Sequence, residues 1–106
     1  MDLIEQLGGY EKAKEWYKDQ DLRGNHTVRI RHALLEYRRQ HNIFEVGDKV
    51  VKTNPKLKFE FVREVKGVFK DGSVWLDYVG YKWKYPKVRH ATDAEIKAGK
   101  RLEVNQ

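Results

Sequence analysis

The stretch that decides the fold is KDGSVWLDYVGYKWKY, residues 70–85. Two sets of residues alternate along it: Val74, Leu76 and Tyr78 with Trp75, Asp77 and Val79, and Tyr81, Trp83 and Tyr85 with Lys82 and Lys84. A period of two is typical of β-strands. Asp71-Gly72 favours a tight type I′ turn near the start of this stretch, because both residues tolerate the positive φ angles of that turn. The stretch therefore predicts consecutive antiparallel strands joined by short turns.

Further short strands are expected on both sides of this stretch. VGDKVV, residues 46–51, predicts a turn into a first strand. Residues 59–69 predict a long strand with a bulge or bend at Gly67, since glycine inside a strand often marks such a point. Residues 88–91 predict a last short strand. Several short strands so close together, with tight turns between them, fit a small antiparallel barrel.

The run 46–51 resembles the opening strand of SH3-like barrels, in which a Gly-Asp pair lies in the turn before two buried valines. The resemblance spans residues 44–92. It implies that residues 43–99 form an SH3-like β-barrel with a short terminal helix. Barrels of this kind occur in translation factors, Tudor-like readers and many prophage proteins, so the fold alone implies no single function.

Capping residues delimit the short C-terminal helix. Thr92 and Glu95 match a capping box, in which the two residues satisfy backbone N–H groups at the helix start. Gly99 suits the C-cap, because glycine readily adopts the left-handed conformation found there. The remaining residues, 100–106, are expected to form a flexible tail.

Residues 1–42 follow a helical pattern. A helix over about residues 3–18 is either broken or kinked at Gly8-Gly9, and a polar loop is expected over 19–25. A helix over 27–41 carries one apolar stripe toward the core, formed by Ile30, Ala33, Leu34, Tyr37 and His41. The sequence thus predicts one compact α+β domain: N-terminal helices, a small antiparallel β-barrel and a short C-terminal helix.

The composition indicates a folded protein whose positive charge favours nucleic acid or acidic protein surfaces as partners, with a merely solvated lysine-rich surface as the alternative. The 106 residues include thirteen aromatic residues and no cysteine, and the net charge is +6. Aromatic residues at this density argue against disorder, and the absence of cysteine excludes disulfides, zinc–thiolate sites and thiol nucleophiles. No apolar run approaches the length of a membrane span, and the acidic start lacks an apolar signal segment, so we expect a cytoplasmic protein.

Catalytic, metal and cofactor sites find little support in the residue inventory. The only serine, Ser73, lies in a predicted turn, and neither a Gly-x-Ser-x-Gly motif nor a glycine-rich phosphate loop is present. His26 and His32 have a spacing used for zinc but lack cysteine partners. We therefore expect no catalytic residues, no metal ligands and no cofactor. A small acid–base enzyme is the last alternative.

The first candidate binding site lies in the stretch quoted above and comprises Trp75, Lys82, Trp83 and Lys84. Tyr81, Trp83 and Tyr85 on one face could stack on bases while Lys82 and Lys84 meet phosphates, or these rings could form a cage for a cationic ligand. Alternatively, one alternating face is simply the barrel core. Trp75 alternates with Val74 and Leu76, so it faces outward if those two face inward.

The second candidate site is the outer face of the 27–41 helix, with Arg31, Leu35, Arg38 and Arg39. Guanidinium groups suit phosphates and carboxylates, and an apolar leucine among them favours a protein contact. A solvated helix face, with partners such as Glu36, is the alternative.

The run VRHATDAEI, residues 88–96, is similar to the strand and capped helix that close several prophage SH3-like proteins. With its short N-terminal helices and lack of cysteine, the chain resembles the small accessory proteins of tailed phages and prophages. This resemblance implies host-directed binding, either to inhibit a defence system or to adapt a host nucleic-acid machine. We therefore expect a non-enzymatic inhibitor or adaptor that engages a host protein or nucleoprotein complex, and neither a membrane nor a small-molecule cofactor as a partner. Direct binding of DNA or RNA by the same basic surface is the alternative.

Overall fold

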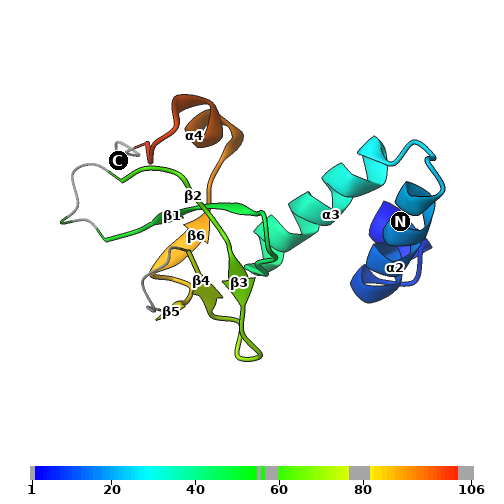
Figure 1. Cartoon of the computed structure of the whole chain (residues 1–106), viewed down its shortest axis with the longest axis horizontal. Helices are drawn as coiled ribbons and strands as arrows, with labels where there is room; N and C mark the ends of the chain where they lie inside the picture. Colours follow the sequence, from blue (N-terminus) through cyan, green and yellow to red (C-terminus); the bar gives the residue numbers. More distant parts are fainter. Residues whose placement is uncertain (1, 55, 57–59, 77–81, 103–106) are drawn as a thin grey trace. The chain divides into compact units, whose positions relative to one another are not determined.

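The computed structural model describes residues 2–54, 56, 60–76 and 82–102. The chain divides into two compact units, Met1–His41 and Asn42–Gln106. The first unit is helical and the second is rich in β-strands (Figure 1). The boundary falls where the sequence pattern changes from helical to alternating, although the sequence alone indicated one compact domain.

The first unit contains three helices: α1 (Leu3–Gln6), α2 (Tyr10–Leu22) and α3 (Val28–His41). At the start of α1 the Asp2 side chain accepts a hydrogen bond of 2.9 Å from the Glu5 N–H, as its capping position predicts. Gly9 adopts a φ of 103° between α1 and α2. The glycines therefore separate two helices and do not merely kink one.

The end of α2 differs from the sequence prediction. The pattern places the end near Lys18 and a loop from Asp19, but the helix continues to Leu22. This last turn buries nothing, since Leu22 is 88% exposed, and an ion pair of 3.1 Å between Arg23 and Asp19 supports it on the surface. The spacing of apolar residues in a sequence cannot reveal a helical turn that contributes no residue to the core.

A small apolar core joins the three helices. Its buried members are Ile4, Ala13, Ile30 and Leu34. Packed around them are the partly buried side chains of Leu3, Leu7, Tyr10, Tyr17, Ala33 and Tyr37. The predicted core stripe of α3 is confirmed in its first four members. The fifth, His41, is exposed, and its ring centre lies 4.2 Å from that of Tyr37.

The second unit contains two three-stranded antiparallel sheets. The first has the order β2-β1-β6 and is built from β1 (Lys49–Lys52), β2 (Arg63–Glu64) and β6 (Val88–His90). The second has the order β3-β4-β5 and is built from β3 (Gly67–Val68), β4 (Val74–Trp75) and β5 (Lys82–Trp83). Among the described residues no strand pair closes the sheets into a barrel. The α+β class and the small antiparallel sheets are confirmed, and the closed barrel is not.

The chain passes from the first sheet to the second at Val65 and Lys66. The Val65 N–H donates to the Asp48 carbonyl at 2.9 Å, whereas the Lys66 N–H donates to the Trp75 carbonyl at 2.7 Å. Because consecutive residues bond to different sheets, the long strand expected over 59–69 becomes two short ones. The change comes immediately before Gly67, where the sequence placed a bend. Position 59 and the predicted strand ends and turn over 77–81 lie outside the described residues.

Side chains from both sheets share one apolar core. Its buried members are Phe44, Val50, Val65, Val74, Leu76 and Val88, with Trp83 packed against them. Val51 is also buried, so both valines of the predicted opening strand are inside. The alternation of the sequence is confirmed on β4, where Val74 is buried and Trp75 is not.

The turn between β3 and β4 is longer than the predicted type I′ turn. The Phe69 N–H donates to the Ser73 carbonyl at 2.9 Å, and the Gly72 N–H donates to the Phe69 carbonyl at 3.0 Å. Gly72 has a φ of 86°, but Asp71 is not among the residues with positive φ. The connection is therefore a three-residue loop with a left-handed glycine. The Asp71 carboxylate instead accepts a hydrogen bond from the Ser73 N–H.

The C-terminal helix α4 (Asp93–Ala98) confirms the predicted capping box. The Thr92 hydroxyl oxygen accepts from the Glu95 N–H at 3.1 Å, and the Glu95 carboxylate accepts from the Thr92 N–H at 3.0 Å. Gly99 ends the helix with a φ of 77°, as its C-cap position predicts.

Residues 100–102, which the sequence placed in a flexible tail, are hydrogen-bonded to the rest of the second unit. Lys100 forms a β-bridge with Phe61. The Arg101 guanidinium donates to the carbonyl oxygens of Lys52 and Asn54 at 2.9 and 3.0 Å. Residues 103–106 lie outside the described part of the chain.

Candidate binding surfaces

The outer face of the β3-β4-β5 sheet brings exposed aromatic rings and lysines together. Trp75 on β4 stands directly opposite Lys82 on β5, and the Lys82 ammonium lies 4.2 Å from the centre of the Phe69 ring. Phe69 and Trp75 are each 39% exposed. Lys84 follows Lys82 by two residues and is exposed too. We call Phe69, Trp75, Lys82 and Lys84 the aromatic-basic face.

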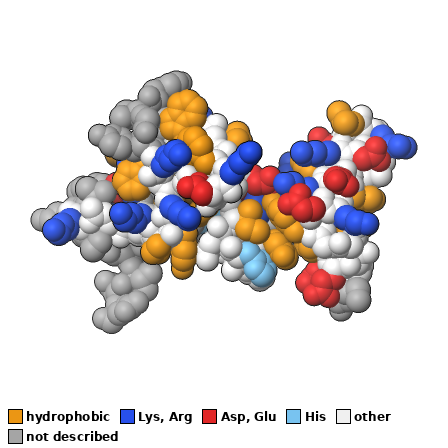
Figure 2. Space-filling model, turned by 90° about the horizontal axis from the view of Figure 1, so that it is seen from below, with side chains coloured by type: hydrophobic (Ala, Val, Ile, Leu, Met, Phe, Trp, Pro, Cys, Tyr) orange, Lys and Arg blue, Asp and Glu red, His pale blue; other side chains and the backbone are white. Residues whose placement is uncertain are grey.

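The lysines of this face act electrostatically on Asp71 in the adjacent turn. The hydrogen bonds that Ser73 donates are the main cause that lowers the pKa of Asp71, and the charges of Lys84 and Lys82 add to it. Neither Lys82 nor Lys84 forms an ion pair with Asp71 or with any other described acid. Both ammonium groups therefore remain available to an anionic partner. Figure 2 shows Lys and Arg side chains among exposed hydrophobic ones over the β-rich unit.

The sequence prediction for this site is confirmed for one side chain and changed for another. Trp75 faces outward, because its neighbours Val74 and Leu76 are buried. Trp83 faces the opposite way and packs against the core, so it does not share a face with Lys82. Phe69 was missed, and alternation with its neighbour gives no signal for it, because Val68 is also exposed, at 43%.

Trp83 also lines a second feature, a groove of about 530 Å³. The described residues that line it are Thr53, Asn54, Trp83, Pro86 and Lys87, and we call it the Trp83 groove. The Lys52 ammonium lies 4.4 Å from the centre of the Trp83 ring. Except for Trp83, none of these residues stood out in the sequence, because they meet only through the pairing of β1 with β6.

The arginine face predicted on α3 is only partly exposed. Arg31 is exposed, whereas Leu35 and Arg38 are half-buried. The Arg39 guanidinium forms an ion pair of 2.8 Å with Glu36, the partner that the solvated-face alternative proposes. The exposed apolar residue on this side of the helix is Val28, at 64%, and not Leu35.

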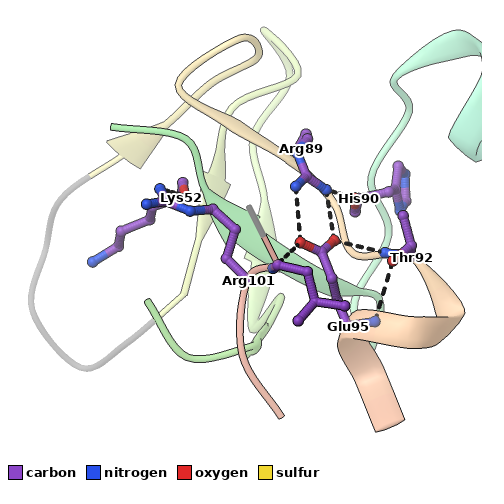
Figure 3. A network of polar contacts seen from close by, with 7 residues as sticks. Lys52, Arg89, His90, Thr92, Glu95 and Arg101 are labelled. Carbon is purple, nitrogen blue, oxygen red and sulfur yellow. Dashed lines mark hydrogen bonds and ion pairs between the residues drawn. The ribbon is translucent and has the colours of Figure 1, made fainter. Parts of the chain in front are cut away.

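A polar network around Glu95 connects β6, the start of α4 and the chain after α4 (Figure 3). The Glu95 carboxylate accepts hydrogen bonds of 2.7 and 2.9 Å from the Arg89 guanidinium and one of 2.8 Å from the Leu102 N–H. Burial raises the pKa of Glu95, but the bonds from Arg89, Thr92 and Leu102 outweigh it and hold that pKa at about 2. Since every carboxylate bond goes to the chain itself, this network is a structural feature. The sequence revealed only its capping role.

The described residues contain no group of three or more histidines, cysteines or acids that could hold a metal ion. Within the same residues, no helix has the length and apolar character needed to span a bilayer. Comparisons with protein-family models, with curated proteins and with solved structures give no significant match.

Proposed function

We propose that the chain is a non-enzymatic, phage-type binding protein that acts in the cytoplasm as an inhibitor or adaptor of a host protein or nucleoprotein complex. The observation that carries this proposal is the exposure of Phe69 and Trp75 beside Lys82 on one face of a sheet. Exposed aromatic rings are enriched where proteins bind one another, and neighbouring cations steer an acidic partner toward them.

The topology of Asn42–Gln106 supports an open version of the SH3-like arrangement. Its strands follow the order β6-β1-β2 in one sheet and β3-β4-β5 in the other, and one run, residues 63–68, contributes to both. The non-enzymatic part of the proposal is supported by the state of the only serine. Ser73 is buried, and its hydroxyl donates to Asp71 within the turn.

A pull-down from a nuclease-treated lysate of a bacterial host tests the proposal. The tagged protein and its Lys97→Gln control, changed on the exposed side of α4, should retain one specific partner. Trp75→Ala should lose that partner while keeping the circular dichroism spectrum of the parent protein. Leu35→Asp reports on the α3 surface in the same assay. Absence of any specific partner, or loss with Leu35→Asp and not with Trp75→Ala, would contradict the aromatic-basic face as the binding site.

Direct nucleic-acid binding is the second candidate function, and one observation favours it. Lys52, Lys82, Lys84 and Lys87 form no ion pair with a described acid, while Lys49 and Lys66 both pair with Glu64. Lys82 lies over the Phe69 ring and Lys52 over the Trp83 ring, an arrangement that suits phosphates and stacked bases. If the protein binds neither DNA nor RNA at low salt, direct nucleic-acid binding is excluded, because phosphate contacts are strongest at low salt.

A further inference from the structure

The Trp83 groove combines a flat apolar surface with two cations. Trp83 and Pro86 provide the apolar part. The Lys52 ammonium lies over the indole at 4.4 Å, and Lys87 lines the groove. Neither lysine forms an ion pair with a described acid, and none of the described lining residues is acidic. The groove is therefore complementary to a ligand that carries both flat rings and negative charge.

The walls of this groove are held in place by hydrogen bonds between distant parts of the chain. The Thr53 hydroxyl donates to the Pro86 carbonyl at 2.6 Å, and the Thr53 N–H donates to the Lys87 carbonyl at 3.0 Å. Arg101 binds the carbonyl oxygens of Lys52 and Asn54 from the other side. A site fixed in this way is formed before its ligand arrives, which lowers the entropy cost of binding.

The polar groups of the groove distinguish between an acidic peptide and a nucleic acid. The N–H of Thr53 already donates to Lys87, and the N–H of Lys87 already donates to the Lys84 carbonyl at 2.9 Å. A peptide backbone finds neither donor free. A nucleobase needs only a flat apolar contact, and its phosphates need only cations. The charge and the aromatic surface therefore favour nucleic acid.

We propose that the Trp83 groove holds an unpaired base of single-stranded nucleic acid, with the adjoining phosphates on Lys52 and Lys87. This inference rests on direct nucleic-acid binding, the second candidate function, and assigns it a site distinct from the aromatic-basic face. A base within a duplex is stacked and paired, so it cannot enter the groove without unpairing. The site selects single strands over duplexes for this reason. On binding, the base displaces the Lys52 ammonium from the indole toward a phosphate.

Fluorescence anisotropy with a labelled oligothymidylate tests this inference, and a length of about 12 nucleotides lies within the range that single OB-fold domains contact. Replacing both Lys52 and Lys87 by glutamine should weaken binding about tenfold at low salt. The slope of log affinity against log salt should become less negative by about 1.4, because each phosphate contact contributes about −0.7 for a single strand. Lys97→Gln should change neither. Quenching of tryptophan fluorescence by the oligonucleotide should decrease in Trp83→Phe, whose folding is verified by circular dichroism.

The outcomes separate the groove from the function on which it rests. If the Lys52/Lys87 double variant binds normally while a Lys82/Lys84 double variant does not, the groove is refuted and nucleic-acid binding survives. Equal affinity for a duplex of the same length also refutes the groove. If the wild-type protein binds no oligonucleotide at low salt, both ideas fail. Binding of an oligoglutamate peptide in place of the oligonucleotide would assign the groove to an acidic protein segment and overturn the inference.

Discussion

Among single residues, Glu95 makes the most consequential contacts of the second unit. Its side chain is almost fully buried, at 1% exposure for the residue. Its carboxylate joins Arg89 on β6, the start of α4 at Thr92, and the chain at Leu102. A buried carboxylate is costly unless it is paired and hydrogen-bonded. Here four hydrogen bonds satisfy it, so three segments depend on one side chain.

Glu95→Gln should lower the free energy of unfolding by about 2–4 kcal/mol. The change removes the negative charge and leaves the Arg89 guanidinium partly buried without its partner; the range is below that of a fully buried pair because Arg89 is about one-third exposed. Urea denaturation followed by circular dichroism measures the effect. Lys97→Gln on the same helix should stay within about 0.5 kcal/mol of the wild type. An unchanged midpoint for Glu95→Gln would show that the network does not stabilise the fold.

The same side chain predicts how stability depends on pH. The pKa of Glu95 is about 2 in the folded protein against 4.5 for an unperturbed glutamate, and hydrogen bonds from Lys49 and Lys66 lower the pKa of Glu64 to about 2 as well. Between pH 4.5 and about 2 the unfolded chain therefore binds more protons than the folded one, so stability falls as the pH falls. Urea midpoints measured across this window should decline with acidification.

A variant separates the two carboxylates in this pH experiment. Glu95→Gln removes one of the two groups with a depressed pKa, so its stability should decline less steeply between pH 4.5 and 2 than that of the wild type. Glu64→Gln should lose part of the decline in the same way, because its carboxylate is the other group. Parallel curves for Glu95→Gln and the wild type would show that Arg89 does not hold the pKa of Glu95 low.

At the scale of elements, the β3–β4 connection depends on one glycine. Gly72 has a φ of 86°, which an alanine adopts only with strain. Gly72→Ala should therefore destabilise the protein by about 1 kcal/mol or more. Lys70→Ala, in the same loop but without a positive φ, should have little effect. Thermal unfolding of the two variants compares them directly. Equal melting temperatures would contradict the left-handed conformation of Gly72.

The elements that the sequence predicted correctly are those with a local cause. The α3 stripe follows from side chains that recur at the helical period and that bury Ile30 and Leu34. The α4 boundaries follow from Thr92 at one end and Gly99 at the other. The last turn of α2 escaped prediction because it buries nothing. The closed barrel was not confirmed. Pairing between distant strands leaves no local signal in the sequence, so the sequence could not distinguish two open sheets from a closed barrel.

The candidate site shows the same division between local and distant causes. The outward direction of Trp75 could be predicted, since the parity of its neighbours determines it. The approach of Lys82 to Phe69 depends on the register of β4 and β5. The Trp83 groove depends on contacts between Thr53 and Pro86, 33 residues apart in sequence. No periodicity within a segment encodes a contact at that separation.

On the scale of the whole molecule, most of the net charge lies in one of the two units. Residues 1–41 carry seven acids and eight bases, whereas residues 42–106 carry nine acids and fourteen bases. The β-rich unit therefore holds a net charge of +5 of its own. It also holds the aromatic-basic face and the Trp83 groove, while the arginines of α3 belong to the helical unit. The surfaces of the β-rich unit can therefore be tested without the α3 surface by producing that unit alone.

A fragment of residues 42–106 should fold alone and retain binding. Its sheets are hydrogen-bonded within the fragment, and its apolar core, from Phe44 to Val88, has a separate set of buried residues from that of the helices. At this size the margin of stability is small, so we expect a lower melting temperature than that of the whole chain. A dispersed amide spectrum by NMR checks the folding, and anisotropy with the oligothymidylate checks the binding. A folded fragment that binds neither the oligonucleotide nor the pull-down partner would move the binding surface to α3.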